Sequence, residues 1–362
     1  MVKDTTLGSA RVLAIPGKGE WRLVGIPELG RRKESSRMVD LPLVLHAGYH
    51  KTATTYLQKN VFRCHPEILY LGRPWVNEAL RLFFRALKYT HDLDFDPEEF
   101  KASFRRILES VAPQPDPDRE SEREPKVVLV SSEGLHSGPE WFGLCVVRMA
   151  RRLRSVFYPC KIILGIRNQP DYTESNYRTY LYHGGKLPFG RFVHESLVGT
   201  KALFPKLQYD KVLSLYRDLF GEEAVHVYLQ ERLKRAPAAE LRNLMAFVGV
   251  DETVEFKHET VYAGWSKIPL ECLRLVNKRL AQDYMEQYFL AGRQGRRFFR
   301  ERLRRRIRRL LRKAERVFFS RRWRLRYLDE ATREHIAERF MASNKALSEQ
   351  LGEEIKQLGY RF

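Results

Sequence analysis

Cysteine is scarce in this chain of 362 residues, and none of its four copies stands in a metal-binding or disulfide pattern. Cys64, Cys145, Cys160 and Cys272 are widely scattered, with no CxxC pair and no Cys/His spacing. These absences exclude a zinc-ribbon protein and a small disulfide scaffold, and they favour a reducing compartment.

Long apolar runs are also missing. No stretch of about 18 apolar residues could span a bilayer, and the N-terminus lacks the basic-then-apolar layout of a secretory signal. We therefore expect a cytoplasmic location, with peripheral membrane contact as a variant of it. Acidic residues number 45 against 65 Lys and Arg, and the net charge of +20 predicts an anionic partner. Nucleic acid, acidic lipid, anionic glycan and a nucleotide cosubstrate all meet that description.

Apolar residues make up 43% of the chain, which is enough for a substantial core. Short apolar runs with polar borders, at 41–46, 126–133, 160–168 and 224–230, predict buried parallel strands. Helical patterns separate these runs, so βαβ units follow. The expected fold class is α/β, a three-layer sandwich with a central parallel sheet and a helical C-terminal extension.

The composition divides the chain into four expected parts. Residues 1–38 carry Gly, Pro and charge without periodicity, which predicts a poorly ordered leader. Residues 39–270 form the α/β core, in which the Pro-rich and charged segment 112–125 predicts a surface loop. Residues 271–327 form a basic amphipathic helical insertion, and 328–362 form a C-terminal helix that completes the core.

The first predicted strand runs into a loop that is suited to bind an anion. His46 is expected to be buried in the strand, and the loop residues are Gly48, Tyr49, His50, Lys51, Thr52, Ala53, Thr54 and Thr55. Backbone N–H groups and the dipole of the following helix would face a phosphate, and Lys51 adds a full charge. The loop is not a Walker A sequence, which needs a glycine directly before the lysine. The same threonines would also suit the start of an ordinary helix.

A second candidate anion site follows the third predicted strand. Arg167 ends that strand, and Ser175 lies eight residues later inside the next helical pattern. A guanidinium matches two phosphate oxygens at once, so both side chains could grip one phosphate. Taken alone, each residue is more typical of an ordinary protein surface. Together with the first loop, they indicate a ligand that carries two separate phosphate groups.

These segments resemble the donor-binding motifs of sulfotransferases that use 3′-phosphoadenosine 5′-phosphosulfate (PAPS). LHAGYHKTATTYLQ looks like the 5′-phosphosulfate loop of bacterial-type members, and Arg167 with Ser175 looks like the 3′-phosphate element. The resemblance continues over 204–250 and near the C-terminus, and it implies a P-loop-like fold, PAPS as cosubstrate, PAP as product and no metal. Ala53 replaces a frequent glycine, which backbone donation tolerates if the local dihedrals are right-handed. Tyr172 replaces a usual arginine.

The resemblance also implies roles for single residues. Lys51 would stabilise charge on the leaving group, and the residues that would hold the 5′-phosphate are Thr52, Ala53, Thr54 and Thr55. His50, beside Lys51, is a further candidate for donor contact. Ser266 and Lys267 would close over the nucleotide.

Sulfuryl transfer needs a group that removes the proton of the acceptor. Glu133 closes the second predicted strand, where partial burial would raise its pKa to suit that role. His136, three residues later, is the competing candidate. A helix N-cap or a salt bridge is the alternative role for Glu133, and an ordinary loop position is the alternative for His136.

The basic charge is concentrated in one segment, because 17 Lys or Arg and only two acids lie between Gly292 and Arg326. Apolar residues recur there at spacings of three and four, which predicts an amphipathic helix. Its apolar side could dock on the core, its basic side could bind an acidic glycan, or it could contact a membrane surface. Nucleic acid is a weaker candidate, since no DNA- or RNA-binding motif accompanies the charge.

The most specific hypothesis is therefore a sulfotransferase that moves a sulfuryl group from PAPS to a hydroxyl or amine, with a glycan or lipid-linked glycan as one acceptor class. A P-loop nucleotide kinase is the first alternative, although GK[ST] and a strand-end Asp for Mg²⁺ are missing. A non-catalytic basic adaptor for membrane or nucleic acid is the second.

Overall fold

The computed structural model describes residues 11–14, 21–24, 40–72, 78–110, 124–132, 135–136, 146–198, 204–256, 265–280, 295–318 and 326–362. The chain forms two compact units, each built from separate segments. The first comprises Met1–Ile166 with Tyr209–Glu259, and the second comprises Arg167–Gln208 with Thr260–Phe362. The boundaries expected after residues 270 and 327 both fall inside the second unit.

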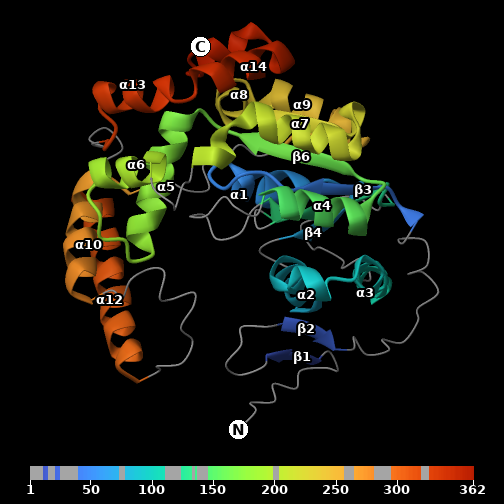
Figure 1. Cartoon of the computed structure of the whole chain (residues 1–362), viewed down its shortest axis with the longest axis horizontal. Helices are drawn as coiled ribbons and strands as arrows, with labels where there is room; N and C mark the ends of the chain where they lie inside the picture. Colours follow the sequence, from blue (N-terminus) through green and yellow to red (C-terminus); the bar gives the residue numbers. More distant parts are fainter. Residues whose placement is uncertain are drawn as a thin grey trace. The chain divides into compact units, whose positions relative to one another are not determined.

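The first unit is built on a five-stranded sheet in the order β4-β5-β3-β6-β7 (Figure 1). Its strands are β3 (Leu43–His46), β4 (Ile68–Gly72), β5 (Val127–Ser131), β6 (Lys161–Ile166) and β7 (Val225–Leu229). All neighbours pair in parallel. This confirms the α/β class with a central parallel sheet. The edge strand β4 was not predicted, because its segment was assigned to helices.

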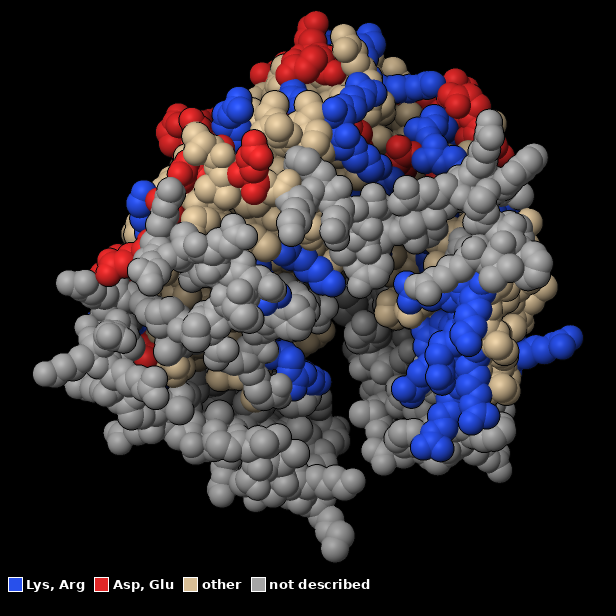
Figure 2. Space-filling view, turned by 180° about the vertical axis from the view of Figure 1, so that it is seen from behind, with Lys and Arg blue, Asp and Glu red and all other residues tan. Residues whose placement is uncertain are grey.

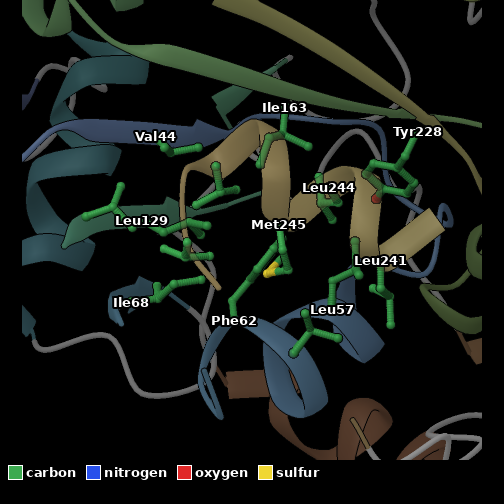
Figure 3. Close-up of a cluster of buried hydrophobic side chains, with 14 of the residues drawn as sticks. Val44, Leu57, Phe62, Ile68, Leu129, Ile163, Tyr228, Leu241, Leu244 and Met245 are labelled. Carbon is green, nitrogen blue, oxygen red and sulfur yellow. The ribbon is translucent and has the colours of Figure 1, made fainter. Parts of the chain in front are cut away.

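One face of the sheet is covered by the helices that follow β3 and β7. These are α1 (Thr54–Tyr56), the π-helix η2 (Leu57–Phe62), α8 (Gln230–Arg235) and α9 (Pro237–Val248). Figure 3 shows how apolar side chains of η2, α8 and α9 meet Val44, Leu129 and Ile163 of the sheet in one buried cluster. Burial contributes about 1.5–3 kcal/mol for each large apolar side chain, so this cluster fixes these helices against the strands.

The opposite face completes a three-layer sandwich. Helix α7 (Tyr209–Phe220) contacts β6 and β7, and α4 (Val146–Phe157) packs on α7. Farther out, α3 (Pro97–Ser110) packs on α4, and α2 (Glu78–Tyr89) packs on α3. The short helices η3 (Asp92–Asp94) and η6 (Glu222–Ala224) complete this unit within the described ranges.

The expected leader contains two short strands. β1 (Arg11–Ala14) pairs with β2 (Trp21–Val24) in antiparallel fashion, as a separate two-stranded sheet. Most of residues 1–38 lie outside the described ranges, so the expectation of a poorly ordered leader stays a prediction. The same holds for the surface loop expected at 112–125.

The described part of the second unit is helical. Its elements are α5 (Gln169–Tyr182), α6 (Phe189–Val198), η5 (Phe204–Leu207), α10 (Lys267–Leu280), α12 (Gly295–Phe318), α13 (Glu330–Glu338), α14 (Met341–Leu351) and η8 (Glu353–Leu358). Helix α5 contacts α6, α10 and α13, and α12 packs along α10. Within the ranges given above, no helix combines the length and apolarity needed to cross a membrane.

Candidate functional site

The β3–α1 loop, residues 47–53, leaves the sheet at the carboxyl end of its central strand. The Tyr49 N–H donates to the Gly165 carbonyl of β6 at 3.3 Å, so the loop begins by extending the strand pairing. A Cβ on Gly48 would lie 2.4 Å from the Gly165 nitrogen, and a Cβ on Gly165 would lie 2.2 Å from the Tyr228 ring. Only glycine fits at these two positions, and the close approach fixes where the loop starts.

Two residues of this loop adopt a left-handed backbone although neither is glycine. The φ angle is 67° at Lys51 and 70° at Ala53, and Thr52 between them does not share it. Alternation of this kind turns successive N–H groups toward one side and forms an anion-binding concavity. Ala53 is also the N-cap of α1, with no side-chain cap, so the first N–H groups of the helix join the same region.

The left-handed backbone decides one condition stated for Ala53. Alanine was expected to be tolerated there if the local dihedrals are right-handed, and with φ 70° and ψ 18° they are left-handed. The left-handed region is unfavourable for a residue with a Cβ by roughly 1–2 kcal/mol. Glycine would therefore suit this position better than alanine, and the loop holds alanine there by its other contacts.

Thr52 attaches the loop to the sheet by buried hydrogen bonds. Its hydroxyl donates to the Tyr49 carbonyl at 2.7 Å, and its Oγ1 lies 3.2 Å from the Tyr228 hydroxyl. The same Tyr228 hydroxyl lies 3.2 Å from Nε2 of His46, the last residue of β3. The Thr52 side chain is thus engaged inside the protein and is not available to bind a ligand from solvent.

The chain of hydrogen bonds continues across the sheet and has one direction. Since the Thr52 hydrogen is used, Thr52 accepts from Tyr228, and the Tyr228 oxygen in turn accepts from His46 Nε2–H. His46 Nδ1 then accepts from the Ser131 hydroxyl at 2.8 Å, and Ser131 accepts from Gln58 Nε2 at 3.0 Å. All five side chains are buried. This polar network places a hydrogen of His46 on Nε2, and the prediction that His46 is buried is confirmed.

The remaining loop candidates differ in exposure. Lys51 is exposed, His50, Ala53 and Thr55 are half-buried, and Thr54 is buried. The charge of Lys51 is therefore at the surface of the loop, where it can meet an anion from solvent. Because the ammonium is on a flexible stem, it can follow a ligand that the backbone groups position.

Of the two candidate bases, the structure describes His136 alone. Glu133 lies outside the described residues. His136 is buried, with its ring centroid 4.1 Å from that of Tyr49, and its Nδ1 lies 3.4 Å from the Tyr216 hydroxyl. Burial raises the pKa of Tyr216, so this phenol keeps its proton. His136 belongs to an aromatic cluster beside the loop, and a proton-accepting role for either candidate stays a prediction.

In the second unit, Arg167 begins a cluster of charges at the start of α5. Asn168 is the N-cap, and its side-chain oxygen accepts from the Asp171 N–H at 3.0 Å. The Asp171 carboxylate pairs with Arg333 at 2.9 Å and with Arg326 at 3.2 Å. Burial alone would raise the pKa of Asp171, but Arg333 and Arg167 outweigh it and lower that pKa. Arg167 therefore lies close enough to act on this carboxylate.

The other candidates of the second unit lie on or beside α5. Ser175 is half-buried on the helix, Ser266 is buried, and Lys267 is half-buried as the first residue of α10. Arg178 of α5 donates to the carbonyl of Trp265, which ties the segment 265–267 to the helix. The structure thus gathers the predicted site residues into two groups, one in each unit.

Three residues of the polar network escaped the sequence analysis. Ser131 ends β5, Tyr228 lies in β7, and Gln58 lies in η2. A signal was present, because polar residues at the carboxyl ends of strands in one parallel sheet face the same edge. His46, Ser131 and Tyr228 all stand at or next to such ends.

Comparisons with known proteins give matches among solved structures alone, since no family model and no curated protein match the chain. A sulfotransferase from Alicyclobacillus acidocaldarius matches at 19% identity and TM-score 0.44, over 71% of this chain and 98% of that one. Mouse sulfotransferase SULT7A1 complexed with PAP matches at 14% and 0.39, over 88% of each chain. Retinol dehydratase in complex with androsterone and inactive cofactor PAP matches at 11% and 0.31, over 89% of this chain and 85% of that one. With identities below 20% and TM-scores below 0.5, none of the three identifies the family of this chain.

Proposed function

We propose that this chain is a sulfotransferase that moves a sulfuryl group from PAPS to a hydroxyl or amine. The observation that carries the proposal is the β3–α1 loop. It combines a central parallel strand, left-handed residues at Lys51 and Ala53, an exposed ammonium and a helix N-terminus. Each of these features favours a phosphate group, and together they fit the 5′-phosphosulfate of the donor.

In the proposed reaction, the acceptor oxygen or nitrogen attacks the sulfur in line with the bond to the 5′-phosphate. A new bond from sulfur to the acceptor forms while the bond to the phosphate oxygen breaks, and PAP leaves. Negative charge develops on that phosphate oxygen, and the Lys51 ammonium with the loop N–H groups would stabilise it. The acceptor proton passes to the base, for which Glu133 is proposed and His136 is the alternative.

Arg167 and Ser175 are proposed to bind the 3′-phosphate, with Ser266 and Lys267 closing over the nucleotide. Arg167 directly follows Ile166, the last residue of β6, and β6 pairs with β3. Ligands of open parallel sheets bind beyond the carboxyl ends of the strands, which is where both proposed anion sites begin.

A titration with fragments of the donor tests the two phosphate sites separately. We expect Lys51→Ala to weaken PAP and 5′-AMP by about 10- to 100-fold and to leave 3′-AMP unchanged. Arg167→Ala should weaken PAP and 3′-AMP by a similar factor and leave 5′-AMP unchanged. Isothermal titration calorimetry measures all six affinities.

Matched controls are available on exposed surface. Lys211→Ala on α7 and Arg151→Ala on α4 remove the same charges and should change no affinity. If Lys51→Ala and Arg167→Ala change the affinities no more than these controls do, the proposed donor site is wrong.

The base is tested by Glu133→Gln. This variant should bind PAP as the unchanged chain does and should lose sulfuryl transfer, measured as PAP release from PAPS with a panel of phenols, amines and sugars. Unchanged turnover would move the role to His136.

A further inference from the structure

Helix α12 presents basic side chains in columns. Among the side chains of α12 that the structure describes, the exposed basic ones are Arg302, Arg305, Arg306, Arg309, Arg312 and Lys313. They fall into three pairs that are seven residues apart, and seven residues make nearly two turns, or about 10.5 Å along the axis. Each pair therefore forms a column, and Figure 2 shows Lys and Arg side chains gathered over this helix.

A column of leucines runs beside the basic ones. Leu303 and Leu310 are 37% and 65% exposed, and they too are seven residues apart. Arg306 is three residues after Leu303 and four before Leu310, so the leucine column adjoins the Arg306 column. Within the described part of the second unit, both leucines are exposed beside the basic columns, so packing there does not account for them.

The opposite side of α12 is attached to the protein. Ile307 and Leu311 are half-buried there, and α12 packs along α10. Arg308 donates to the Tyr182 carbonyl at 3.1 Å, and its guanidinium lies 4.6 Å from the Tyr182 ring centroid. These contacts turn the basic and leucine columns toward solvent.

We propose that this face of the helix, the α12 face, binds the surface of an anionic membrane. The α12 face is made of Arg302, Leu303, Arg305, Arg306, Arg309, Leu310, Arg312 and Lys313. The basic columns complement acidic lipid headgroups, and the leucine column would enter the boundary between headgroups and acyl chains. A polyanion such as an acidic glycan or nucleic acid would engage the basic columns and leave the leucines without a role. The pairing of both columns therefore favours a lipid surface.

The proposal is tested on the full chain by flotation with vesicles of phosphatidylcholine, alone or with 30% phosphatidylglycerol. Basic residues near such a surface contribute roughly fivefold each, so the mixed vesicles should bind at least tenfold more tightly. Leu303→Ser with Leu310→Ser keeps all charges and should weaken that binding at least tenfold. Arg305→Gln with Arg312→Gln should weaken it by about 25-fold.

Two controls and one competitor complete the test. Leu275→Ser on α10 alters a leucine that is 55% exposed, and Arg151→Gln alters an exposed arginine on α4; neither should change vesicle binding. Equal binding to both vesicle types overturns the proposal. A second result also overturns the proposal: Leu303→Ser with Leu310→Ser binds vesicles as the unchanged chain does, and heparin or duplex DNA displaces the vesicles completely. The α12 face would then bind polyanions. PAP affinity, measured on the same samples, reports the donor site separately from the α12 face.

Discussion

The substitution Tyr228→Phe removes one buried hydroxyl and keeps the ring that packs in the core cluster. This hydroxyl accepts from His46 Nε2–H and donates to Thr52 Oγ1, each at 3.2 Å. It is the link between the β3–α1 loop and the rest of the polar network. Its removal tests whether that network holds the loop in place.

The expected loss of stability depends on the hydrogen-bonding groups that lose a partner when Tyr228 becomes phenylalanine. His46 and Thr52 are 1% and 0% exposed, so neither can turn to water. A buried donor without an acceptor costs about 1–3 kcal/mol, and the His46 N–H becomes such a donor. Thr52 keeps its bond to the Tyr49 carbonyl and loses only an incoming one. We therefore expect the free energy of unfolding to fall by about 2 kcal/mol.

Urea denaturation followed by circular dichroism measures this loss. Tyr158→Phe, at a tyrosine that is 47% exposed, is the matched control and should stay within about 0.5 kcal/mol of the unchanged chain. The double variant with Ser131→Ala adds a second test, because both residues bond the His46 ring. A coupling energy of at least about 0.5 kcal/mol is expected. An unchanged stability for Tyr228→Phe, or strictly additive effects, would refute the single-direction network.

Three further predictions concern the loop and the sheet. Ala53→Gly should raise the free energy of unfolding by up to about 1 kcal/mol, because glycine adopts the left-handed backbone more readily than alanine does. The control Ala102→Gly, exposed on α3, should lower the free energy of unfolding by about 1 kcal/mol. If both variants lose the same stability in denaturant, the left-handed backbone assigned to Ala53 is contradicted. Gly48→Ala should lower the free energy of unfolding by more than about 3 kcal/mol, because its Cβ would meet the backbone of β6 at 2.4 Å. The control Gly190→Ala, whose Cβ would have no atom within 4 Å, should leave the stability unchanged or raise it in thermal melts. Burial lowers the pKa of His226 from 6.5 to about 4. As the pH drops, His226 therefore takes up a proton in the unfolded chain before it does so in the folded one. The free energy of unfolding should fall by at most about 3 kcal/mol between pH 6.5 and pH 4. His226→Gln should flatten that fall in urea titrations across this range, and identical slopes would argue against it.

The sheet was predictable because parallel strands buried on both faces are apolar almost throughout. The predicted runs 41–46, 126–133, 160–168 and 224–230 contain β3, β5, β6 and β7. The edge strand β4 was missed, since a five-residue segment between helical patterns gives little periodic signal.

The position of the β3–α1 loop was also predictable, because a strand, a lysine with hydroxyl residues and a helix follow each other locally. Its backbone was not. The left-handed angle of Ala53 results from how the loop is held against β6 and Tyr228, and alanine itself gives no sign of it. The side chains of the polar network are bonded to partners that are 73 to 182 positions away in the chain, which local spacing cannot relate.

The division into two units depended on contacts that a linear pattern does not contain. Helix α5 follows β6 without a break, so the chain pattern placed it in the core. In the structure α5 packs with α10 and α13, and its Gln169 amide bonds Asn344 of α14 at 2.7 Å. Such side chains, polar and far apart in sequence, decide the unit to which a helix belongs.

Whether this chain binds a bisphosphorylated adenosine donor is measured by calorimetric titration of the unchanged protein with PAP, ADP and ATP. We expect PAP to bind at least about tenfold more tightly than either of the other two, because only PAP carries both the 5′- and the 3′-phosphate. Tighter binding of ATP than of PAP would contradict it and would favour a nucleotide kinase.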